Sequence, residues 1–204
     1  MRGYLAAVLL GYLCGTPNPS LLLSRLKGVD VTESGTGNPG ASNTALLMGV
    51  PLGLLVAFFD ISKGIVAVRL CRRLVPTLAH AGVVGGVACV LGHMFPFYRR
   101  FRGGKGFASY VGMILALDWR FIAYFLVPIL LFMLVTDYLV FGNISTMVLF
   151  PVYSAVRLGV FSGLLLCSLS FVMLYRHREN FAGIRRGTET HIRLRERSEF
   201  RLKK

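Results

Sequence analysis

A turn of three glycines around one lysine has the residue types that proteins use to hold an anion. Glycine lacks a Cβ, so main-chain N–H groups in such a turn can approach a negative charge closely. A helix predicted to begin at Phe107 adds the positive end of its dipole at the same place. The pattern therefore indicates a phosphate site made of Gly103, Gly104, Lys105 and Gly106.

Three arginines precede this turn and have two interpretations. They could add to the phosphate site, or they could form a positively charged cytoplasmic loop of the kind that orients membrane proteins. The second interpretation explains the arginines well, but orientation does not require a dense glycine cluster. The glycines therefore favour the anion site, whatever the role of Arg99, Arg100 and Arg102.

A second polar segment, residues 25–43, ends in the run Ser34–Asn43, which is rich in Gly, Ser, Thr and Asn. Such a run can be simply a flexible connection between helices. Hydroxyls, side-chain amides and glycine N–H groups are also what a second phosphate or polyol site would use. Composition and spacing leave both interpretations open.

His177 and Asn180 stand where the last apolar segment gives way to a basic tail, residues 176–204. Their i, i+3 spacing places them on one face of a predicted helix. The far end of the tail fits a solvated cytoplasmic segment held to anionic lipids, at about 1 kcal/mol for each basic residue near the surface. That explanation does not cover the histidine and the asparagine, which remain candidates for a site.

Three further candidates, Asp60, Lys63 and His93, are ionisable residues within or at the end of apolar segments. An ionised side chain inside a membrane span costs about 2.5–3.5 kcal/mol on insertion scales, so such residues normally pair or serve a function. Asp60 and Lys63 are three positions apart and can pair with each other. His93 lies beside the glycine turn, where a hydrogen-bonded structural role is commoner than a direct one.

The elements that carry these residues follow from high hydrophobicity, 54%, combined with a formal net charge of +14. Charge gathered in a few loops and a tail is typical of a polytopic membrane protein, so we expect an all-α helical bundle in one domain, residues 1–204. The apolar runs leave no soluble core for a nucleic-acid surface, which points to anionic lipids and phosphorylated small molecules. The four widely spaced cysteines fit packing positions, with no metal and no disulfide.

The apolar runs predict about seven segments, several of them shorter than the roughly 20 residues needed to span hydrocarbon. We expect the short ones to be tilted, re-entrant or partly merged. The first is broken at Gly15–Pro19, and a break at membrane depth must be covered by protein or water. The predicted segments are 3–24, 44–70, 79–96, 107–117, 121–135, 141–156 and 159–175.

The distribution of basic residues predicts which end of the bundle faces the cytoplasm. If residues 25–43, 98–106 and 176–204 share one side, that side holds sixteen of the 23 lysines and arginines. By the positive-inside rule this side is cytoplasmic and the N-terminus lies outside. All three polar segments then face the same compartment. Three arginines at 69–73 fall on the outer side, where they fit poorly.

Four motifs, in their order and spacing, resemble the bacterial acyl-phosphate:glycerol-3-phosphate acyltransferase family, whose members are integral membrane enzymes with seven spans. Each motif alone is weakly specific, whereas the four in sequence along the whole chain are fairly specific. The motifs are Ser34–Asn43, Asp60–Gly64, Gly92–Gly106 and the C-terminal group Arg176, His177, Asn180 and Gly187–Glu189.

The resemblance implies transfer of a fatty acyl group from acyl phosphate to the 1-hydroxyl of glycerol 3-phosphate, giving lysophosphatidic acid for phospholipid synthesis. It places the enzyme among the lipids of the bacterial inner membrane, with its site at the cytoplasmic face and no cofactor. By motif position, the implied catalytic residues are Thr36, Lys105, His177 and Asn180. The implied substrate-binding residues are Ser34, Gly37, Asn38, Gly40, Asn43, His93, Gly103, Gly104, Gly106 and Glu189.

The chain departs from the family pattern at several polar positions. Thr36 stands where a serine is usual, which keeps the hydroxyl. An arginine usually follows the Asn43 motif, where this chain has Ala45–Leu47, and another usually follows Asn180, where it has Gly183. Lost cations weaken phosphate binding, since a charge-assisted hydrogen bond contributes about 1.5–3 kcal/mol. A further arginine and serines of the family are replaced by Asp137, Val140 and Asn143.

Two other functions stay open from the sequence. A divergent paralogue would use another phosphorylated acceptor or would lack activity. A transporter of organic phosphates would also need broken spans, an anion site and ionisable residues in the membrane. Such transporters often contain internal repeats, and we find none in this sequence, so the acyltransferase interpretation is preferred.

Overall fold

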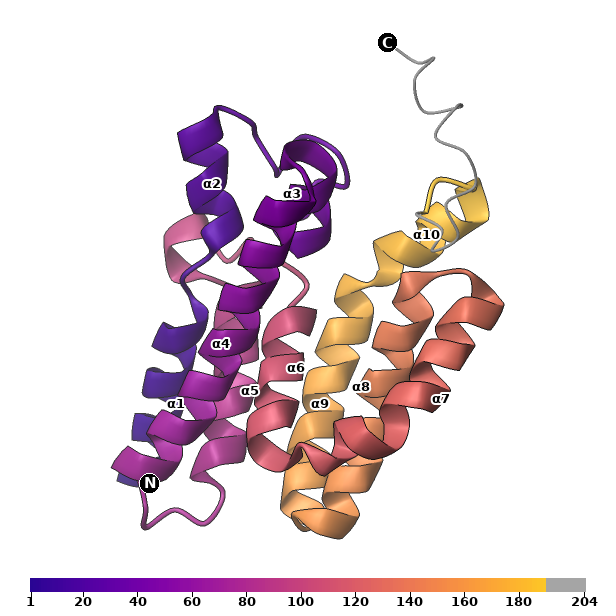
Figure 1. Ribbon diagram of the computed structural model, residues 1–204. Coiled ribbons are helices and arrows are strands. Elements are labelled where there is room, and N and C mark those ends of the chain that lie inside the picture. The colour runs from indigo at the N-terminus through magenta and orange to yellow at the C-terminus, as the bar shows by residue number, and fades with distance from the viewer. Residues whose placement is uncertain (190–204) are drawn as a thin grey trace, which may run out of the picture.

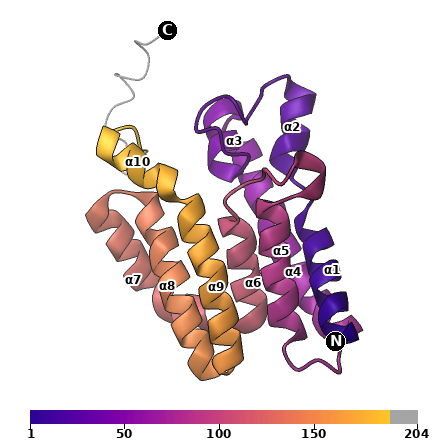
Figure 2. The ribbon, with the colours of Figure 1, turned by 180° about the vertical axis from the view of Figure 1, so that it is seen from behind.

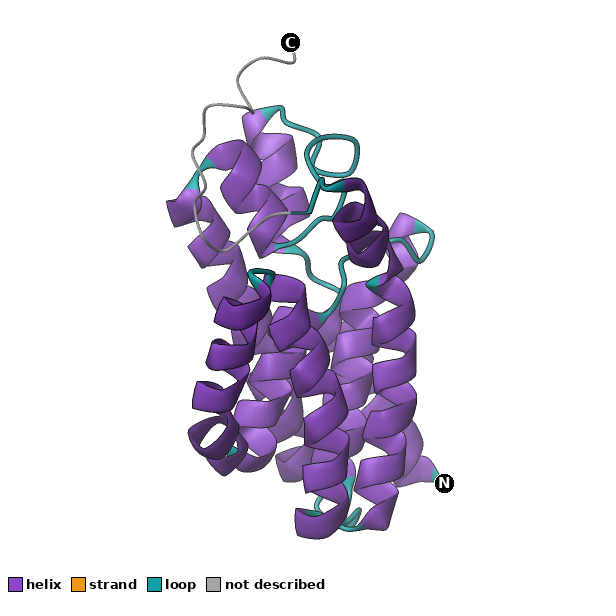
Figure 3. Cartoon of the chain, turned by 90° about the vertical axis from the view of Figure 1, so that its right-hand side faces the viewer, coloured by secondary structure: helices purple, strands orange, loops and turns teal. Residues whose placement is uncertain are grey.

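The computed structural model describes residues 1–189, and this part of the chain consists of helices and turns without any strand (Figure 1, Figure 3). The all-α prediction is confirmed. The predicted basic tail beyond Glu189 lies outside the described residues. The helices are α1 (Arg2–Gly15), α2 (Pro19–Lys27), α3 (Ala41–Met48), α4 (Val50–Leu74), α5 (Ala81–Met94), the 3-10 helix η1 (Phe97–Arg99), α6 (Phe107–Asp118), α7 (Arg120–Thr136), α8 (Leu139–Arg157), α9 (Val160–Arg176) and α10 (Arg178–Arg186).

The helices reproduce the predicted apolar segments except 44–70, which is divided at Gly49 (φ 95°) into α3 and α4. Two of the helices, α6 and α7, are apolar but shorter than a full span, as their short runs in the sequence predict. Together with the longer spans they give the expected seven spanning or partly spanning segments. The parts long and apolar enough to cross a membrane are Arg2–Lys27, Val50–Leu74, Ala81–Arg99, Leu139–Arg157 and Val160–Arg186.

A short break separates α1 from α2, as the two prolines there predict. Asn18 caps α2 with its side chain. The carbonyls freed by the break are covered by protein, because Tyr98 Oη donates to Thr16 O at 2.6 Å and Lys63 Nζ donates to Pro17 O at 2.8 Å. The break therefore faces the inside of the bundle, where side chains from two other segments replace its missing helical hydrogen bonds.

α1 packs against α5 with the two backbones in close contact. A Cβ added at Gly11 would collide with the carbonyl oxygen of Gly85, and one added at Gly15 would collide with that of Cys89. Helices in membranes approach this closely where small residues line the contact. The same holds between α4 and α6, where Gly112 faces the backbone of α4. These contacts make α1, α4, α5 and α6 a firm support for the turn that joins α5 to α6.

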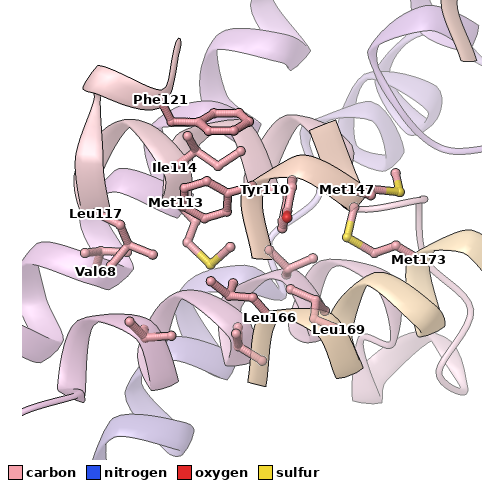
Figure 4. Close-up of a cluster of buried hydrophobic side chains, with 14 of the residues drawn as sticks. Val68, Tyr110, Met113, Ile114, Leu117, Phe121, Met147, Leu166, Leu169 and Met173 are labelled. Carbon is pink, nitrogen blue, oxygen red and sulfur yellow. The ribbon is translucent and has the colours of Figure 1, made fainter. Parts of the chain in front are cut away.

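Long side chains, in contrast, join α6 to α8 and α9 (Figure 4). Tyr110 of α6 and Phe150 of α8 meet edge to face, with ring centroids 5.9 Å apart. Methionines fill the irregular space between them, for which their flexible side chains are suited. The buried residues around these rings include Met113, Ile114, Met147, Leu166, Leu169 and Met173.

The polar segments lie together at one end of the bundle (Figure 1, Figure 2). α2, α3 and α10 gather there, whereas the N-terminus lies at the opposite end. The sequence predicted this shared end. At the opposite end, Arg72 Nη1 donates to Ala116 O at 2.8 Å and caps the C-terminal end of α6. This contact gives a structural role to one of the three arginines that fit the outer side poorly.

Candidate active site

The glycine turn between α5 and α6 folds back onto the end of α5. Gly103 N donates to Met94 O at 3.0 Å, and a Cβ added at Gly103 would collide with the carbonyl oxygen of His93. Gly106 has a φ of 85°, a conformation that favours glycine, and it precedes α6, which begins at Phe107 as the sequence predicts. This backbone hydrogen bond, the close packing against α5 and the positive φ of Gly106 together fix the position of Lys105.

Lys105, Asn180 and Glu189 form a chain of hydrogen bonds between this turn and the segment around α10. Lys105 Nζ donates to Asn180 Oδ1 at 2.5 Å, and Asn180 Nδ2 donates to Glu189 Oε1 at 2.8 Å. Gly183 makes room for this arrangement, because a Cβ there would lie 2.8 Å from Glu189 Oε2. Three residues that the sequence assigned to one site are thus in direct contact.

Burial lowers the pKa of Lys105 below that of an ordinary lysine, because the charged form loses solvation. The carboxylates of Glu189 and Glu179 act in the opposite direction, and the nearby charge of Arg176 lowers the pKa further. The hydrogen-bond partner of the ammonium is a neutral amide, and no direct ion pair neutralises it within residues 1–189. An incoming anion would therefore meet an available positive charge.

Arg176 anchors the turn, a role that the sequence did not assign to it. Its Nη2 donates to Gly103 O at 2.7 Å and to Gly104 O at 3.3 Å. In a trans peptide the carbonyl and the following N–H point in opposite directions, so this contact turns the N–H groups of Gly104 and Lys105 away from Arg176. The signal in the sequence was a basic residue at the end of the last apolar run, directly before His177.

His177 lies at a bend between two helices. α9 ends at Arg176 and α10 begins at Arg178, so His177 and Asn180 do not share one continuous helical face as their spacing predicted. The His177 side chain is 2% exposed, and its Nδ1 donates to Met173 O at 2.8 Å. A neutral imidazole with a donor at Nδ1 has an acceptor at Nε2. The bend thus supplies a buried acceptor close to the positive charge of Lys105.

His93 lies on the α5 side of the same turn and is 4% exposed. Its Nδ1 is 2.7 Å from Lys63 Nζ and 3.3 Å from Asp60 Oδ1. Lys63 and Asp60 also pair with each other at 2.7 Å, which their spacing predicted. A Cβ added at Gly104 would collide with His93 Nε2, so the ring lies directly against the turn. His93 therefore connects a buried ionic cluster to the candidate site.

The Ser34–Asn43 loop is shaped chiefly by Asn43. Its Nδ2 donates to Val31 O at 2.8 Å and to Ser34 O at 3.1 Å, while its Oδ1 accepts from Thr36 N at 2.8 Å. No hydrogen bond joins this loop to the Lys105 turn in the part of the chain that the structure describes. Direct substrate binding by the loop stays a prediction, with Thr36 and Gly37 exposed, Ser34 and Asn38 half-buried and Gly40 buried.

A polar cavity of about 410 Å³ lies between α2 and η1. Arg25 and Arg99 contribute cations to its lining, and Asp30 contributes a carboxylate. Hydrogen bonds from the side chain and backbone of Thr32 lower the pKa of Asp30, which keeps it ionised. The carboxylate offsets part of the positive charge, so this cavity suits a phosphate less well than the Lys105 turn does.

Fold and site together define a polytopic helical membrane protein with a cationic glycine turn at one end. Residues 5–187 match the sequence model of the family described as glycerol-3-phosphate acyltransferase. Glycerol-3-phosphate acyltransferase 1 of Oceanobacillus iheyensis is 34% identical over 196 residues, which cover 93% of this chain and 95% of the relative. The glycerol-3-phosphate acyltransferase of Cronobacter sakazakii is 34% identical over 186 residues, covering 91% and 90%.

Crystal structures of PlsY, an integral membrane glycerol 3-phosphate acyltransferase, have a similar fold. Its glycerol 3-phosphate form matches with a TM-score of 0.83 at 28% identity, over 92% of this chain and 94% of that one. Its lysophosphatidic acid form matches over the same shares with a TM-score of 0.80. The chain therefore belongs to the glycerol-3-phosphate acyltransferase family of membrane acyltransferases, and the family predicted from its motifs is confirmed.

Proposed function

We propose that this chain transfers a fatty acyl group from acyl phosphate to the 1-hydroxyl of glycerol 3-phosphate at the end of the bundle that carries Lys105. One observation carries the proposal. In the part of the chain that the structure describes, the ammonium of the glycine turn has no direct ion pair and donates to Asn180, which donates in turn to Glu189, at one end of a membrane bundle. That combination suits a phosphorylated substrate and gives an acyl chain access from the bilayer.

The chemistry of acyl phosphate decides what the protein must supply. The hydroxyl oxygen of the acceptor bonds to the acyl carbon, the bond from that carbon to the phosphate oxygen breaks, and phosphate leaves with the electron pair. The hydroxyl proton leaves its oxygen and ends on the released phosphate. Because phosphate is already a good leaving group, no covalent nucleophile is needed, and catalysis lies in holding two phosphorylated molecules together and stabilising charge.

The described residues fit these needs in distinct roles. The Lys105 ammonium and the N–H groups of its turn bind a phosphate, since both present positive charge and no direct ion pair neutralises the ammonium within residues 1–189. His177 presents Nε2 as an acceptor, which orients the attacking hydroxyl. Asn180 forms hydrogen bonds with both Lys105 and Glu189 and so fixes their positions relative to each other.

Charge supports a site at the cytoplasmic face of a bacterial inner membrane. The segments at this end and the tail that follows carry sixteen of the 23 lysines and arginines. Basic loops stay on the cytoplasmic side during insertion, so an acceptor from the cytoplasm and an acyl donor from the adjoining leaflet would both enter at this end. Acceptor and donor would thus reach the site without crossing the bilayer.

Purified protein in detergent, supplied with acyl phosphate and glycerol 3-phosphate, should release inorganic phosphate and form lysophosphatidic acid. Lys105→Ala should lower kcat/KM by about a thousandfold, by analogy with the loss of a charge-stabilising donor at other acyl-transfer sites. Lys27→Ala removes an exposed cation at the end of α2 and serves as the matched control, with activity unchanged.

Near-normal turnover by Lys105→Ala would remove the phosphate-binding role of the turn. Phosphate release that does not depend on glycerol 3-phosphate would point to a different acceptor. Uptake of labelled glycerol 3-phosphate into proteoliposomes without an acyl donor would instead support a transporter, and we expect none.

A further inference from the structure

The ionic cluster beneath the glycine turn consists of Asp60, Lys63 and His93, drawn from α4 and α5. The Lys63 ammonium has three hydrogens and three acceptors within reach: His93 Nδ1 at 2.7 Å, Pro17 O at 2.8 Å and Asp60 Oδ1 at 2.7 Å. The first two are hydrogen bonds, and the third is an ion pair without hydrogen-bond direction. An ammonium donates and never accepts, so His93 Nδ1 is the acceptor in their contact.

We propose that Lys63 and Asp60 hold His93 in the tautomer that carries its proton on Nε2. A neutral imidazole has one donor and one acceptor, and Lys63 makes Nδ1 the acceptor. Asp60 holds Lys63 in place through their 2.7 Å ion pair. The Nε2–H then faces Gly104 and presents a neutral donor at the turn. Lys63 and Asp60 are thus positioning residues that act through the ring of His93.

The opposite tautomer of His93 would weaken phosphate binding at the glycine turn. If Lys63 were absent, Nδ1–H would donate to Asp60, which lies 3.3 Å away. The lone pair of Nε2 would then face the turn and repel a phosphate oxygen. The value of the Nε2–H at the turn rests on the proposed function, because it assumes that a phosphate binds there. The tautomer itself does not depend on that function.

Nitrogen NMR of protein labelled with ¹⁵N-histidine in detergent tests the tautomer directly. The chain has four histidines, and His93→Gln identifies the His93 signals by their loss. We expect a pyridine-type Nδ1 and a pyrrole-type Nε2 for His93 at neutral pH, and a shift of the Nε2 signal on titration with inorganic phosphate. A protonated Nδ1 with an unprotonated Nε2 would overturn the proposal, whatever the enzymatic activity.

Two substitutions of His93 separate a donor at Nε2 from simple packing. The amide nitrogen of glutamine can take the place of Nε2, whereas that of asparagine reaches only the place of Nδ1. His93→Gln should therefore keep kcat/KM for glycerol 3-phosphate within a few-fold of the wild type. His93→Asn should lower it by about tenfold to a hundredfold, the loss of one hydrogen bond to a charged group. Equal losses in both variants would contradict a donor role.

Lys63→Met should produce a defect that depends on pH. The charged groups that face the ring are Asp60 and Lys63 of α4 and Arg176 of α9, and the Cys89 thiol lies one turn away on α5. Without Lys63, the neutral ring presents a lone pair to the turn, and protonation of the ring at lower pH restores Nε2–H. The defect in kcat/KM should therefore shrink as pH falls.

A defect of Lys63→Met that is constant across pH would show that Lys63 is merely structural. Arg69→Met removes an exposed cation from the same helix and serves as the control, with no change in activity or in the His93 signals. If wild-type protein released no phosphate, the proposed function would fail, while the NMR result would still decide the tautomer.

Discussion

His93 and His177 are both buried, His93 against the glycine turn and His177 near the charge of Lys105, yet their rings are held in opposite ways. An ammonium from Lys63 approaches Nδ1 of His93, whereas a carbonyl from Met173 accepts from Nδ1 of His177. The first ring consequently presents a donor at Nε2, as proposed above, and the second presents an acceptor. Residue type alone does not set the role of a histidine, because the partner of the far nitrogen decides it.

The largest effect that would test this contrast comes from His177. His177→Ala should lower kcat by about a hundredfold or more, because the proposed acceptor for the attacking hydroxyl is lost. His177→Asn keeps an amide for the Met173 carbonyl without an acceptor at the place of Nε2, so it should lose a similar factor. Initial rates at saturating substrate check both variants.

Thermal unfolding of the two His177 variants serves as the control for folding. An active His177→Asn beside an inactive His177→Ala would assign the residue to structure alone. In that case the two rings would still differ in their hydrogen bonds, but the acceptor of His177 would have no role in the reaction.

A smaller effect is expected from the contact of His93 with the turn. Gly104→Ala adds a Cβ that collides with the ring, so either the ring or the turn must move. We expect KM for glycerol 3-phosphate to rise about tenfold to a hundredfold, with a weaker change in kcat, since a displacement of about 1 Å costs this much at a positioned site. Steady-state kinetics with varied acceptor measures the split.

Gly3→Ala is the matched control for this substitution, because Gly3 lies at the opposite end of the bundle and its added Cβ would meet only side chains, the nearest 3.3 Å away. It should leave both constants unchanged. An unchanged KM in Gly104→Ala would mean that the ring of His93 does not set the geometry of the turn.

The smallest expected effect is a shift in the alkaline limb of the profile of kcat/KM against pH. The pKa of Lys105 is lowered, so its ammonium loses a proton at lower pH than an ordinary lysine, and kcat/KM should fall there as pH rises. Glu189 raises this pKa, so Glu189→Gln should move the limb to lower pH, and Glu179→Gln should move it less in the same direction.

Glu33→Gln, an exposed carboxylate in the polar loop, should leave the limb in place. The profile of kcat/KM against pH for the four proteins measures these shifts. A limb that stays fixed in Glu189→Gln would separate Lys105 from the ionisation that controls activity.

Much of this arrangement is predictable from the sequence. Apolar runs predict the helices, and the distribution of basic residues predicts that the polar segments share one end of the bundle. The i, i+3 spacing of Asp60 and Lys63 predicts their ion pair. The glycines around Lys105 gave the turn, because their missing side chains and the start of α6 are local properties of the chain. These features depend on neighbours in sequence, where periodicity and residue type are informative.

The remaining features depend on contacts between distant segments. The contacts of Lys63 with His93 and of Arg176 with the turn join residues that are 30 and 73 positions apart. No pattern of neighbouring residues in the sequence predicts these contacts. Asn43 matches a binding motif in the sequence, whereas in the structure its side-chain amide forms hydrogen bonds with backbone groups of its own loop. The bend at His177 likewise appears only once α9 and α10 are placed, because a helical spacing carries no sign of where the helix ends.

The broken first span has a consequence for biogenesis. Asp60 and Lys63 leave the ribosome together, one turn apart, so α4 can enter the translocon with each charge beside its counterion, which reduces the penalty for an isolated charge in lipid. By then the free Pro17 carbonyl has already been made, and α5 follows with His93. Assembly of the cluster beneath the glycine turn therefore waits for α5 to insert, and a truncated product ending before α5 would lack the His93 acceptor of Lys63.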